Sequence, residues 1–276
     1  MRRFSNNFNE MEKALTLQET QQESFKILLK LKEIFDAHGW KYYLAYGTLI
    51  GAYRHNGFIP WDDDVDLYVP RKDYDAFIDY AIEYEEELLP FKIIHFKNNP
   101  QYVYPIARFT NTEFYCDYFN IRDYGLGTFV DLYPLDNYED NPKLVKRVVR
   151  LMRQISIAGS KRIPKGKSNL KYILKLPYAL IVKHKNINKL LRKFEQLSLT
   201  YGDKETDNYL VFWSNNKPVM SKKTFFTNDV FHEFNGEQFR VPDNAEVLLN
   251  IDYKDYKKLP PESERVAHHY YKIYKK

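Results

Sequence analysis

The spacing of apolar residues predicts a helix, a strand and a second helix near the start of the chain. Apolar residues recur three and four positions apart between about residues 15 and 38, at Phe25, Leu28, Leu31 and Phe35. Gly39 is placed to end that helix. A short strand is expected over residues 42–46, and Gly47-Thr48 breaks it before a short helix over residues 49–55.

The next segment predicts a sheet. Strict alternation over residues 64–69 indicates a strand with one apolar face, and Pro70 ends it. A helix is expected from Arg71 to Leu89, followed by strands near residues 91–96, 102–109 and 128–133. This order of elements predicts a mixed sheet flanked by helices, so the fold class is α/β or α+β.

A basic segment occupies the second half of the chain. Residues 143–193 contain no Asp or Glu and carry Lys143, Lys146, Arg147, Arg150, Arg153, Lys161, Arg162, Lys165, Lys167, Lys171, Lys175, Lys183, Lys185, Lys189, Arg192 and Lys193. Apolar residues recur at helical spacing within it, which predicts two or three helices separated by a loop at residues 164–166. Since the formal net charge of the whole chain is only +5, the remainder is net acidic.

This charge asymmetry has three interpretations. The basic residues can form an ordinary solvated helical face. They can form a nucleic-acid surface, but no nucleic-acid-binding motif accompanies them, which argues against nucleic acid as a partner. They can also dock on an anionic membrane, which suits basic helices that carry Leu, Ile and Tyr. We favour the membrane interpretation.

Composition predicts a globular protein of a reducing compartment. Of the 276 residues, 44% are hydrophobic and 17% aromatic, which is ample for a buried core. The single cysteine, Cys116, excludes an intramolecular disulfide and a cysteine-rich zinc site, and we expect it to be a bystander. The first ten residues lack the apolar stretch of a signal peptide, and no window approaches the about 20 apolar residues of a spanning helix. We therefore expect a cytoplasmic protein that can make peripheral contact with the inner face of the membrane.

Four aspartates in five positions suggest a metal site. Asp64 and Asp66 lie two residues apart on the expected strand, so their carboxylates project from one face. Like charges this close need a neutralising cation, and paired oxygen ligands favour Mg²⁺ or Mn²⁺. Asp62 shares the metal-facing parity, whereas Asp63 is expected to point away.

Further site residues are expected on neighbouring elements. Asp131 is a lone aspartate in an apolar and aromatic strand and is the candidate third carboxylate, while Asp136 is expected in a turn. Backbone N–H groups at Gly47 and Thr48 open a helix, where anions bind. Arg54 and Arg71 flank the acidic run and can either hold a phosphate or form salt bridges to the carboxylates.

The run from residue 46 to residue 66, YGTLIGAYRHNGFIPWDDDVD, resembles the signature of the LicD family, which is related to fukutin and fukutin-related protein. Further agreement lies at residues 128–136, at 234–236 with 239–242, and at 253–261. Because these blocks span most of the chain, we expect one catalytic unit over residues 1–276. Its parts are a nucleotidyltransferase-like core at about 40–140, the basic helical insertion at about 141–202 and a C-terminal part at about 203–276.

The resemblance implies a phosphotransferase. Such enzymes move phosphocholine or a polyol phosphate from a cytidine diphosphate (CDP) ester such as CDP-choline to a glycan hydroxyl and release cytidine monophosphate (CMP). Lipopolysaccharide or a teichoic acid precursor, lipid-linked at the membrane, is the implied acceptor. The vertebrate ribitol phosphate transferases carry a cysteine zinc site that this chain lacks, so phosphocholine is the nearer reading.

The resemblance also implies roles for residues. Asp64 and Asp66 bind Mg²⁺ or Mn²⁺, and Asp131 holds a second ion or accepts the proton of the acceptor. Arg265 and His268, in a run that resembles the family's closing block, are expected to reach the site. Two alternatives stay open: a nucleotidyltransferase that modifies protein or RNA, and a non-catalytic module that binds nucleotide or nucleic acid.

Overall fold

The computed structural model describes residues 13–118, 121, 123–163, 169–214, 218–267 and 271–276. The helices in this part of the chain are α1 (Leu17–His38), α2 (Tyr46–His55), α3 (Arg71–Glu83), α4 (Pro142–Gly159), α5 (Asn169–Lys183), α6 (Ile187–Ser198) and α7 (Ala245–Tyr253). The strands are β1 (Tyr43–Leu44), β2 (Asp66–Pro70), β3 (Phe91–Ile94), β4 (Ala107–Asn111), β5 (Phe114–Tyr118), β6 (Thr128–Tyr138), β7 (Asn208–Val211), β8 (Val219–Lys222), β9 (Val230–Phe234), β10 (Glu237–Val241) and β11 (Tyr271–Lys275).

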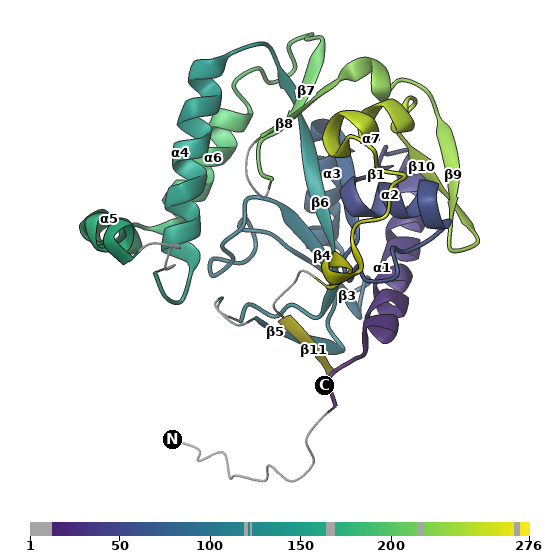
Figure 1. Cartoon of the computed structure of the whole chain (residues 1–276), viewed down its shortest axis with the longest axis horizontal. Helices are drawn as coiled ribbons and strands as arrows, with labels where there is room; N and C mark the ends of the chain where they lie inside the picture. The colour runs from purple at the N-terminus through teal and green to yellow at the C-terminus, as the bar shows by residue number, and fades with distance from the viewer. Residues whose placement is uncertain (1–12, 119–120, 122, 164–168, 215–217, 268–270) are drawn as a thin grey trace.

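A mixed sheet runs through the centre of the molecule (Figure 1). Its strands follow the order β1-β2-β6-β4-β3, and β7 and β8 extend it from the far end of β6. β2 and β6 are parallel, whereas the other pairs in the sheet are antiparallel. Two small antiparallel pairs, β9 with β10 and β11 with β5, stand beside it. The mixed sheet with flanking helices confirms the predicted α+β class.

Helix α1 forms as its sequence predicts and covers the sheet. Thr16 and Glu19 close a capping box at its start, and Gly39 ends it in the left-handed region at φ 67°. Its buried face includes Leu28, Leu31 and Phe35, all of which belong to the core that the sheet shares with α3. Burial of this stripe, more than intrinsic helix propensity, holds α1 in place.

Strand β6 is longer than predicted and runs past Pro134 to Tyr138. Pairing with β4 ends at Leu132, and pairing with β7 begins at Asp136. Pro134 falls in the gap between these two partners, so its missing N–H interrupts neither ladder on that side. The expectation that Asp136 sits in a turn is therefore wrong. Other boundaries also move: α3 ends at residue 83 instead of 89, and β4 begins at residue 107 instead of 102.

The basic segment forms three helices, α4, α5 and α6, on one side of the sheet (Figure 1). Apolar residues of α4 and α6 belong to a second core cluster, in which Val148, Ile155, Leu191 and Phe194 pack together with Phe212. The helices agree with the prediction, while the loop expected at residues 164–166 lies outside the described residues. Among the residues that the structure describes, no helix has the length and apolar character needed to cross a bilayer.

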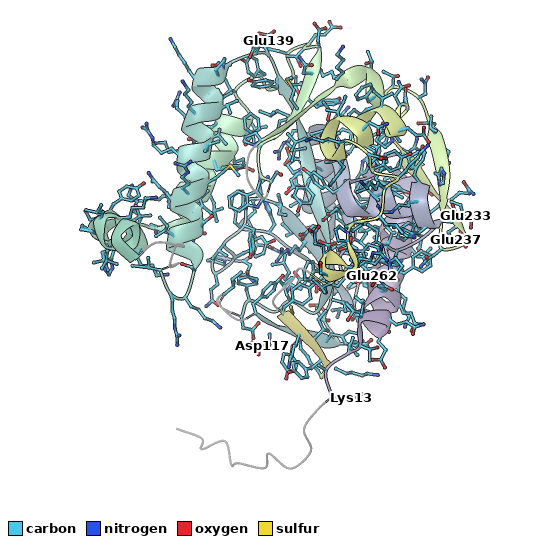
Figure 2. The ribbon with its side chains drawn as sticks, viewed as in Figure 1. Lys13, Asp117, Glu139, Glu233, Glu237 and Glu262 are labelled. Carbon is cyan, nitrogen blue, oxygen red and sulfur yellow. The ribbon has the colours of Figure 1, made fainter. Side chains whose placement is uncertain are left out.

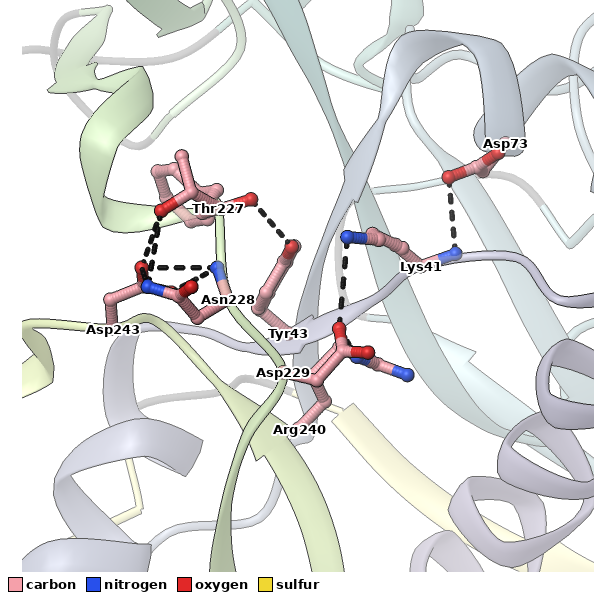
Figure 3. Close-up of polar contacts among 9 residues, drawn as sticks. Lys41, Tyr43, Asp73, Thr227, Asn228, Asp229, Arg240 and Asp243 are labelled. Atoms are coloured by element: carbon pink, nitrogen blue, oxygen red, sulfur yellow. Dashed lines mark hydrogen bonds and ion pairs between the residues drawn. The ribbon is translucent and has the colours of Figure 1, made fainter.

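Polar contacts tie the segment around β9 and β10 to β1 and α3 (Figure 3). Asp229 receives ion pairs from Arg240 and from Lys41, whose Nζ lies 3.6 Å away. The backbone N–H of Lys41 donates to Asp73 at the start of α3 over 3.0 Å. Nearby, the Tyr43 hydroxyl donates to the carbonyl oxygen of Phe226 over 3.0 Å. These contacts hold the β9–β10 hairpin against β1, the edge strand of the sheet, which leads into α2.

Candidate active site

The acidic run lies in the connection that leads from α2 into β2. One carboxylate oxygen each from Asp62, Asp63 and Asp64 lies within 4.8 Å of the others. β2 begins only at Asp66, so Asp64 precedes the strand instead of lying on it. Side chains alternate between faces only within a strand, which is why Asp63 joins the cluster although alternation predicted that it points away.

Asp66, at the start of β2, is a buried acid of this group. The residue is 7% exposed, and within the described part of the chain its Oδ1 has no hydrogen-bond partner. Burial raises the pKa of Asp66 well above its ordinary value, and the charges of Asp64, Asp131 and Asp62 raise it further. The acids of the run and Asp131 therefore converge on the Asp66 carboxylate.

Asp131 lies beside Asp66 in the sheet. The two residues are direct partners in the parallel pairing of β2 and β6, where neighbouring strands run roughly 4.8 Å apart. Asp131 is also buried, at 6% exposure. The juxtaposition expected for these two aspartates is present, although the pair comes from Asp66 and Asp131, with Asp64 entering from the preceding loop.

Arg108 on β4 is a site residue that the sequence interpretation missed. It donates to Asp131 from Nε over 2.6 Å and from Nη2 over 3.3 Å, and its guanidinium lies 4.4 Å from the ring centroids of both Tyr104 and Phe129. Burial lowers the pKa of Arg108, but the Asp131 carboxylate more than offsets this, so the pKa is raised. The sequence did contain a signal for this residue. Arg108 is a lone arginine in an apolar strand, just as Asp131 is a lone aspartate in one.

Gly47 and Thr48 lie in the first turn of α2, which begins at Tyr46, and not in a turn before the helix as predicted. The N–H groups of a first helical turn have no partner within the helix and can donate to an anion, so anion binding at this turn stays a prediction. The Thr48 hydroxyl accepts a hydrogen bond from the N–H of Asp66 over 2.9 Å. A Cβ at Gly47 would stand 2.5 Å from Oδ2 of Asp62. Glycine therefore allows the Asp62 carboxylate to approach the helix.

The two flanking arginines have different surroundings. Arg71 donates to buried Asp136 over 2.6 and 3.1 Å, and Asp136 more than offsets the lowering of the pKa of Arg71 by burial. Of the two roles expected for Arg71, the structure thus shows a salt bridge, although the partner of Arg71 is Asp136 and not a carboxylate of the acidic run. Arg54 donates to the carbonyl oxygen of Tyr256 over 2.8 Å; burial lowers the pKa of Arg54, while the charge of Asp62 acts in the opposite direction.

The C-terminal part of the chain closes one side of the acidic run. Arg265 places its guanidinium 5.6 Å from the ring centroid of Trp61, the residue before Asp62. Tyr271 on β11 donates from its hydroxyl to the backbone oxygen of Asp63 over 3.3 Å. Arg265 thus lies at the edge of the site, while His268 falls outside the described residues.

Tyrosine rings gather beside Asp66, a set that the sequence could not single out among 24 tyrosines. The ring centroid of Tyr46 lies 4.9 Å from that of Tyr68 and 5.2 Å from that of Tyr133. Burial raises the pKa of Tyr133 and of Tyr253, and for both the charge of Asp66 is the next cause. Tyr46 adopts φ 45°, in the left-handed region that costs a non-glycine residue energy. The strained backbone of Tyr46 therefore occurs at a residue whose ring packs beside the acidic site.

The carboxylate cluster fits a hard divalent cation. Asp62, Asp63 and Asp64 offer oxygen ligands within reach of one ion, and the Asp66 oxygen without a hydrogen-bond partner is buried beside them. A buried polar atom without a partner is costly, and a cation would satisfy it. Carboxylate oxygens at this density suit Mg²⁺ or Mn²⁺ better than softer metals.

Comparisons with known proteins identify the family of this chain. Residues 39–159 match the family model described as LicD/FKTN/FKRP, nucleotidyltransferase domain. The chain is 30% identical to the lipopolysaccharide cholinephosphotransferase LicD of Haemophilus influenzae, over 95% of this chain and 99% of that protein. An uncharacterized protein of Rickettsia typhi is 27% identical over 47% of this chain and 37% of its own length. The chain therefore belongs to the LicD family of phosphotransferases.

Proposed function

We propose that this chain transfers phosphocholine, or a related alcohol phosphate, from a CDP-linked donor to a glycan hydroxyl and releases CMP. The Haemophilus relative is named as a lipopolysaccharide cholinephosphotransferase and aligns with nearly the whole chain. Lipopolysaccharide is therefore the first acceptor to test, and a teichoic acid precursor is the second. A lipid-linked form of either would bring the acceptor to the inner face of the membrane.

The observation that carries this proposal is the buried carboxylate of Asp66 among Asp62, Asp64 and Asp131. Burial and the neighbouring charges make the ionised form of Asp66 costly, as the raised pKa reflects. Catalytic sites concentrate such perturbed acids, whereas a structural turn has no need of them. Mg²⁺ held here by Asp66 and the acids of the run would neutralise the diphosphate and the charge that develops on it.

The protein groups around the cluster position the donor. The backbone N–H groups of Gly47 and Thr48 lie in the first turn of α2, where a diphosphate oxygen can accept hydrogen bonds from them. The Thr48 hydroxyl fixes the N–H of Asp66, and thus joins the start of α2 to the carboxylate. Arg265, at the edge beside Trp61, would meet outer phosphate oxygens.

Asp131 has a more constrained role than the sequence suggested. Both of its oxygens accept hydrogen bonds from Arg108, but each carboxylate oxygen has two lone pairs. The remaining lone pairs can bind a cation. Of the two roles implied for Asp131, the Arg108 pair thus favours ion ligand over proton acceptor.

The reaction exchanges one phosphorus–oxygen bond for another. The acceptor hydroxyl oxygen forms a bond to the phosphorus of phosphocholine, and the bond from that phosphorus to the bridging oxygen breaks. CMP leaves with the bridging oxygen, and the hydroxyl proton passes to a carboxylate oxygen of the cluster. Alignment and charge neutralisation are the main demands of such a transfer. Carboxylates held on the paired strands β2 and β6 would meet both demands.

The tyrosines beside Asp66 suit a quaternary ammonium group. A trimethylammonium group cannot donate hydrogen bonds and is held by aromatic ring faces. Tyr46 and Tyr133 form a wall next to the carboxylates, and Tyr253 stands near it with 41% of its surface exposed. These rings favour choline over uncharged alcohols such as glycerol or ribitol.

Purified protein incubated with Mg²⁺ and each CDP ester in turn, of choline, ethanolamine, glycerol and ribitol, tests the proposal. We expect CMP release that depends on acceptor, is fastest with CDP-choline and is lost in Asp66→Asn. Asp79→Asn, at an exposed position on α3, is the matched control and should keep the rate. Transfer of labelled nucleotide to protein or RNA, with no CMP from any ester, would show a different nucleotidyltransferase activity.

A further inference from the structure

Helix α5 exposes a stripe of apolar side chains. Leu174, Tyr178 and Ile181 are spaced four and three residues apart, so they lie on one side of the helix. Their exposed fractions are 72%, 48% and 67%. Ala179 and Val182, which project in other directions from the same helix, are buried against the rest of the molecule. α5 is thus seated in the fold while large apolar side chains face outward.

The neighbouring helices do not share this feature. α4 and α6 bury their apolar residues and expose basic ones, for example Arg150 on α4 and Arg192 on α6. A solvated helical face accounts for that arrangement. It does not account for α5, because solvent contact with Leu and Ile is unfavourable unless another apolar surface covers them.

Positive charge surrounds the exposed stripe. Lys175 on α5 and Lys185 after it are exposed, as are Lys161 and Arg162 after the end of α4. From residue 143 to residue 193 the sequence contains no acidic residue. Figure 2 shows side chains reaching outward from α4 and α5, while the labelled Glu233 and Glu237 lie at the opposite side of the molecule. The complementary surface is therefore both apolar and negatively charged.

We propose that α5 docks this protein on an anionic lipid bilayer. The stripe of Leu174, Tyr178 and Ile181 enters the boundary between headgroups and acyl chains, while the flanking Lys and Arg side chains contact lipid phosphates. A second copy of the chain fits this surface poorly, because two segments rich in Lys and Arg would face each other. The phosphates of nucleic acid would bind the positive charge, but they would not cover exposed Leu and Ile side chains.

This docking goes beyond the proposed reaction and does not depend on it. Its basis is the exposed stripe and the charge around it, whereas the reaction rests on the carboxylate cluster. Binding can be measured without turnover, so a failure of one proposal leaves the other standing. With the proposed function, docking would bring the site to a lipid-linked acceptor.

The test is co-sedimentation of the full chain with vesicles of phosphatidylcholine alone or mixed with phosphatidylglycerol. Binding should require phosphatidylglycerol. It should weaken at least about tenfold when salt rises from about 0.1 M to about 1 M, because the Debye length then falls from about 10 Å to about 3 Å. Leu174→Ser with Ile181→Ser should abolish binding, and so should Lys161→Gln, Arg162→Gln and Lys175→Gln combined.

The matched control lies on α7. Val247 and Ile251 are spaced four residues apart with exposed fractions of 51% and 63%, but Glu246 and Asp252 flank them. Val247→Ser with Ile251→Ser removes a similar apolar area in an acidic surround and should leave vesicle binding unchanged. Circular dichroism and melting temperature check that every variant folds.

Three outcomes would overturn the proposal. Equal sedimentation with neutral and anionic vesicles would remove its electrostatic basis. A dimer in solution that the α5 apolar variant converts to monomer, without vesicle binding, would assign the stripe to a second copy. Tight, salt-sensitive RNA binding without vesicle binding would assign the charge to nucleic acid.

Discussion

Arg108 and Asp131 form a bidentate ion pair across β4 and β6, with N–O distances of 2.6 and 3.3 Å, directly beside the Asp66 carboxylate. Both partners are buried, at 7% and 6% exposure. A buried pair stabilises little by itself, yet loss of one partner leaves a charge that the interior cannot solvate. Arg108 therefore fixes the position of the Asp131 carboxylate at the edge of the cluster.

Arg108→Met should destabilise the fold by about 3–5 kcal/mol, because it leaves Asp131 buried without its partner. Addition of Asp131→Leu to Arg108→Met should recover part of that loss but not activity. Arg71→Met breaks the comparable pair with Asp136 and is the matched control. It should lose similar stability but keep Mg²⁺ binding. Urea unfolding measures the stability of both variants. An Arg108→Met protein as stable as wild type would contradict this account.

Asp66→Asn should leave the protein folded and at least as stable, since it removes a buried charge and its repulsion by Asp64 and Asp131. We expect Mg²⁺ to raise the melting temperature of the wild-type protein but not of Asp66→Asn or Asp64→Asn, both of which should lack turnover. Differential scanning calorimetry with Mg²⁺ or with EDTA measures this shift. An unchanged Mg²⁺ shift in both variants would place the ion elsewhere.

Gly47→Ala should impair the site while sparing the fold. The new Cβ would stand 2.5 Å from Oδ2 of Asp62, a side-chain end that can move, and the change in stability should stay within about 1 kcal/mol because alanine favours helix. The displaced carboxylate should weaken Mg²⁺ binding, which isothermal titration calorimetry can measure. Gly51→Ala is the contrast, since its Cβ would meet the backbone oxygen of Gly57 at 2.4 Å. That variant should unfold more readily.

His95 should make stability depend on pH. It is 1% exposed, and burial lowers its pKa well below the ordinary value of 6.5, with the charges of Lys97 and Arg71 contributing. Below pH 6.5 the unfolded chain binds a proton that the folded protein does not, so the free energy of unfolding falls by up to about 1.4 kcal/mol per pH unit. Above pH 6.5 this contribution is fully present. His95→Phe should lose the slope in urea unfolding between pH 5 and 7; an identical slope would assign it to other groups.

Tyr253→Ala should discriminate between donors. Loss of one ring face costs a bound cation roughly 1–2 kcal/mol, or about five- to thirtyfold in KM. We expect that increase for CDP-choline and a smaller one for CDP-glycerol, with the released CMP as the readout. Tyr253→Phe keeps the ring and should behave like wild type. Equal effects of Tyr253→Ala on both donors would place the ammonium group elsewhere.

Local patterns in the sequence were sufficient for several features. Spacing of apolar residues predicted α1 and the helices of the basic segment, because a helix that buries one face leaves a period of three to four in its sequence. The acidic run and the lone Asp131 could be identified as candidate site residues, because they are charged residues beside or within apolar segments. The resemblance to the LicD family rested on the same residues and agrees with the comparisons.

Pairing between distant segments decided the rest. The partner of Arg71 proved to be Asp136, 65 positions away, and the partner of Asp131 proved to be Arg108. Both depend on which strands adjoin in the sheet and on their register, which no local window encodes. Asp63 turned inward for a related reason, since β2 begins after it and alternation no longer applies.

The amino-acid sequence by itself thus determined the helices, the family and the acids of the candidate site, because each leaves a mark within a few dozen residues. Only the tertiary structure decided that Asp66 and Asp131 lie side by side, that tyrosines line their site and that α5 exposes its apolar stripe. Whether a side chain is buried or exposed depends on which elements pack over it. Periodicity shows that an apolar face exists, but the packed fold determines what covers it.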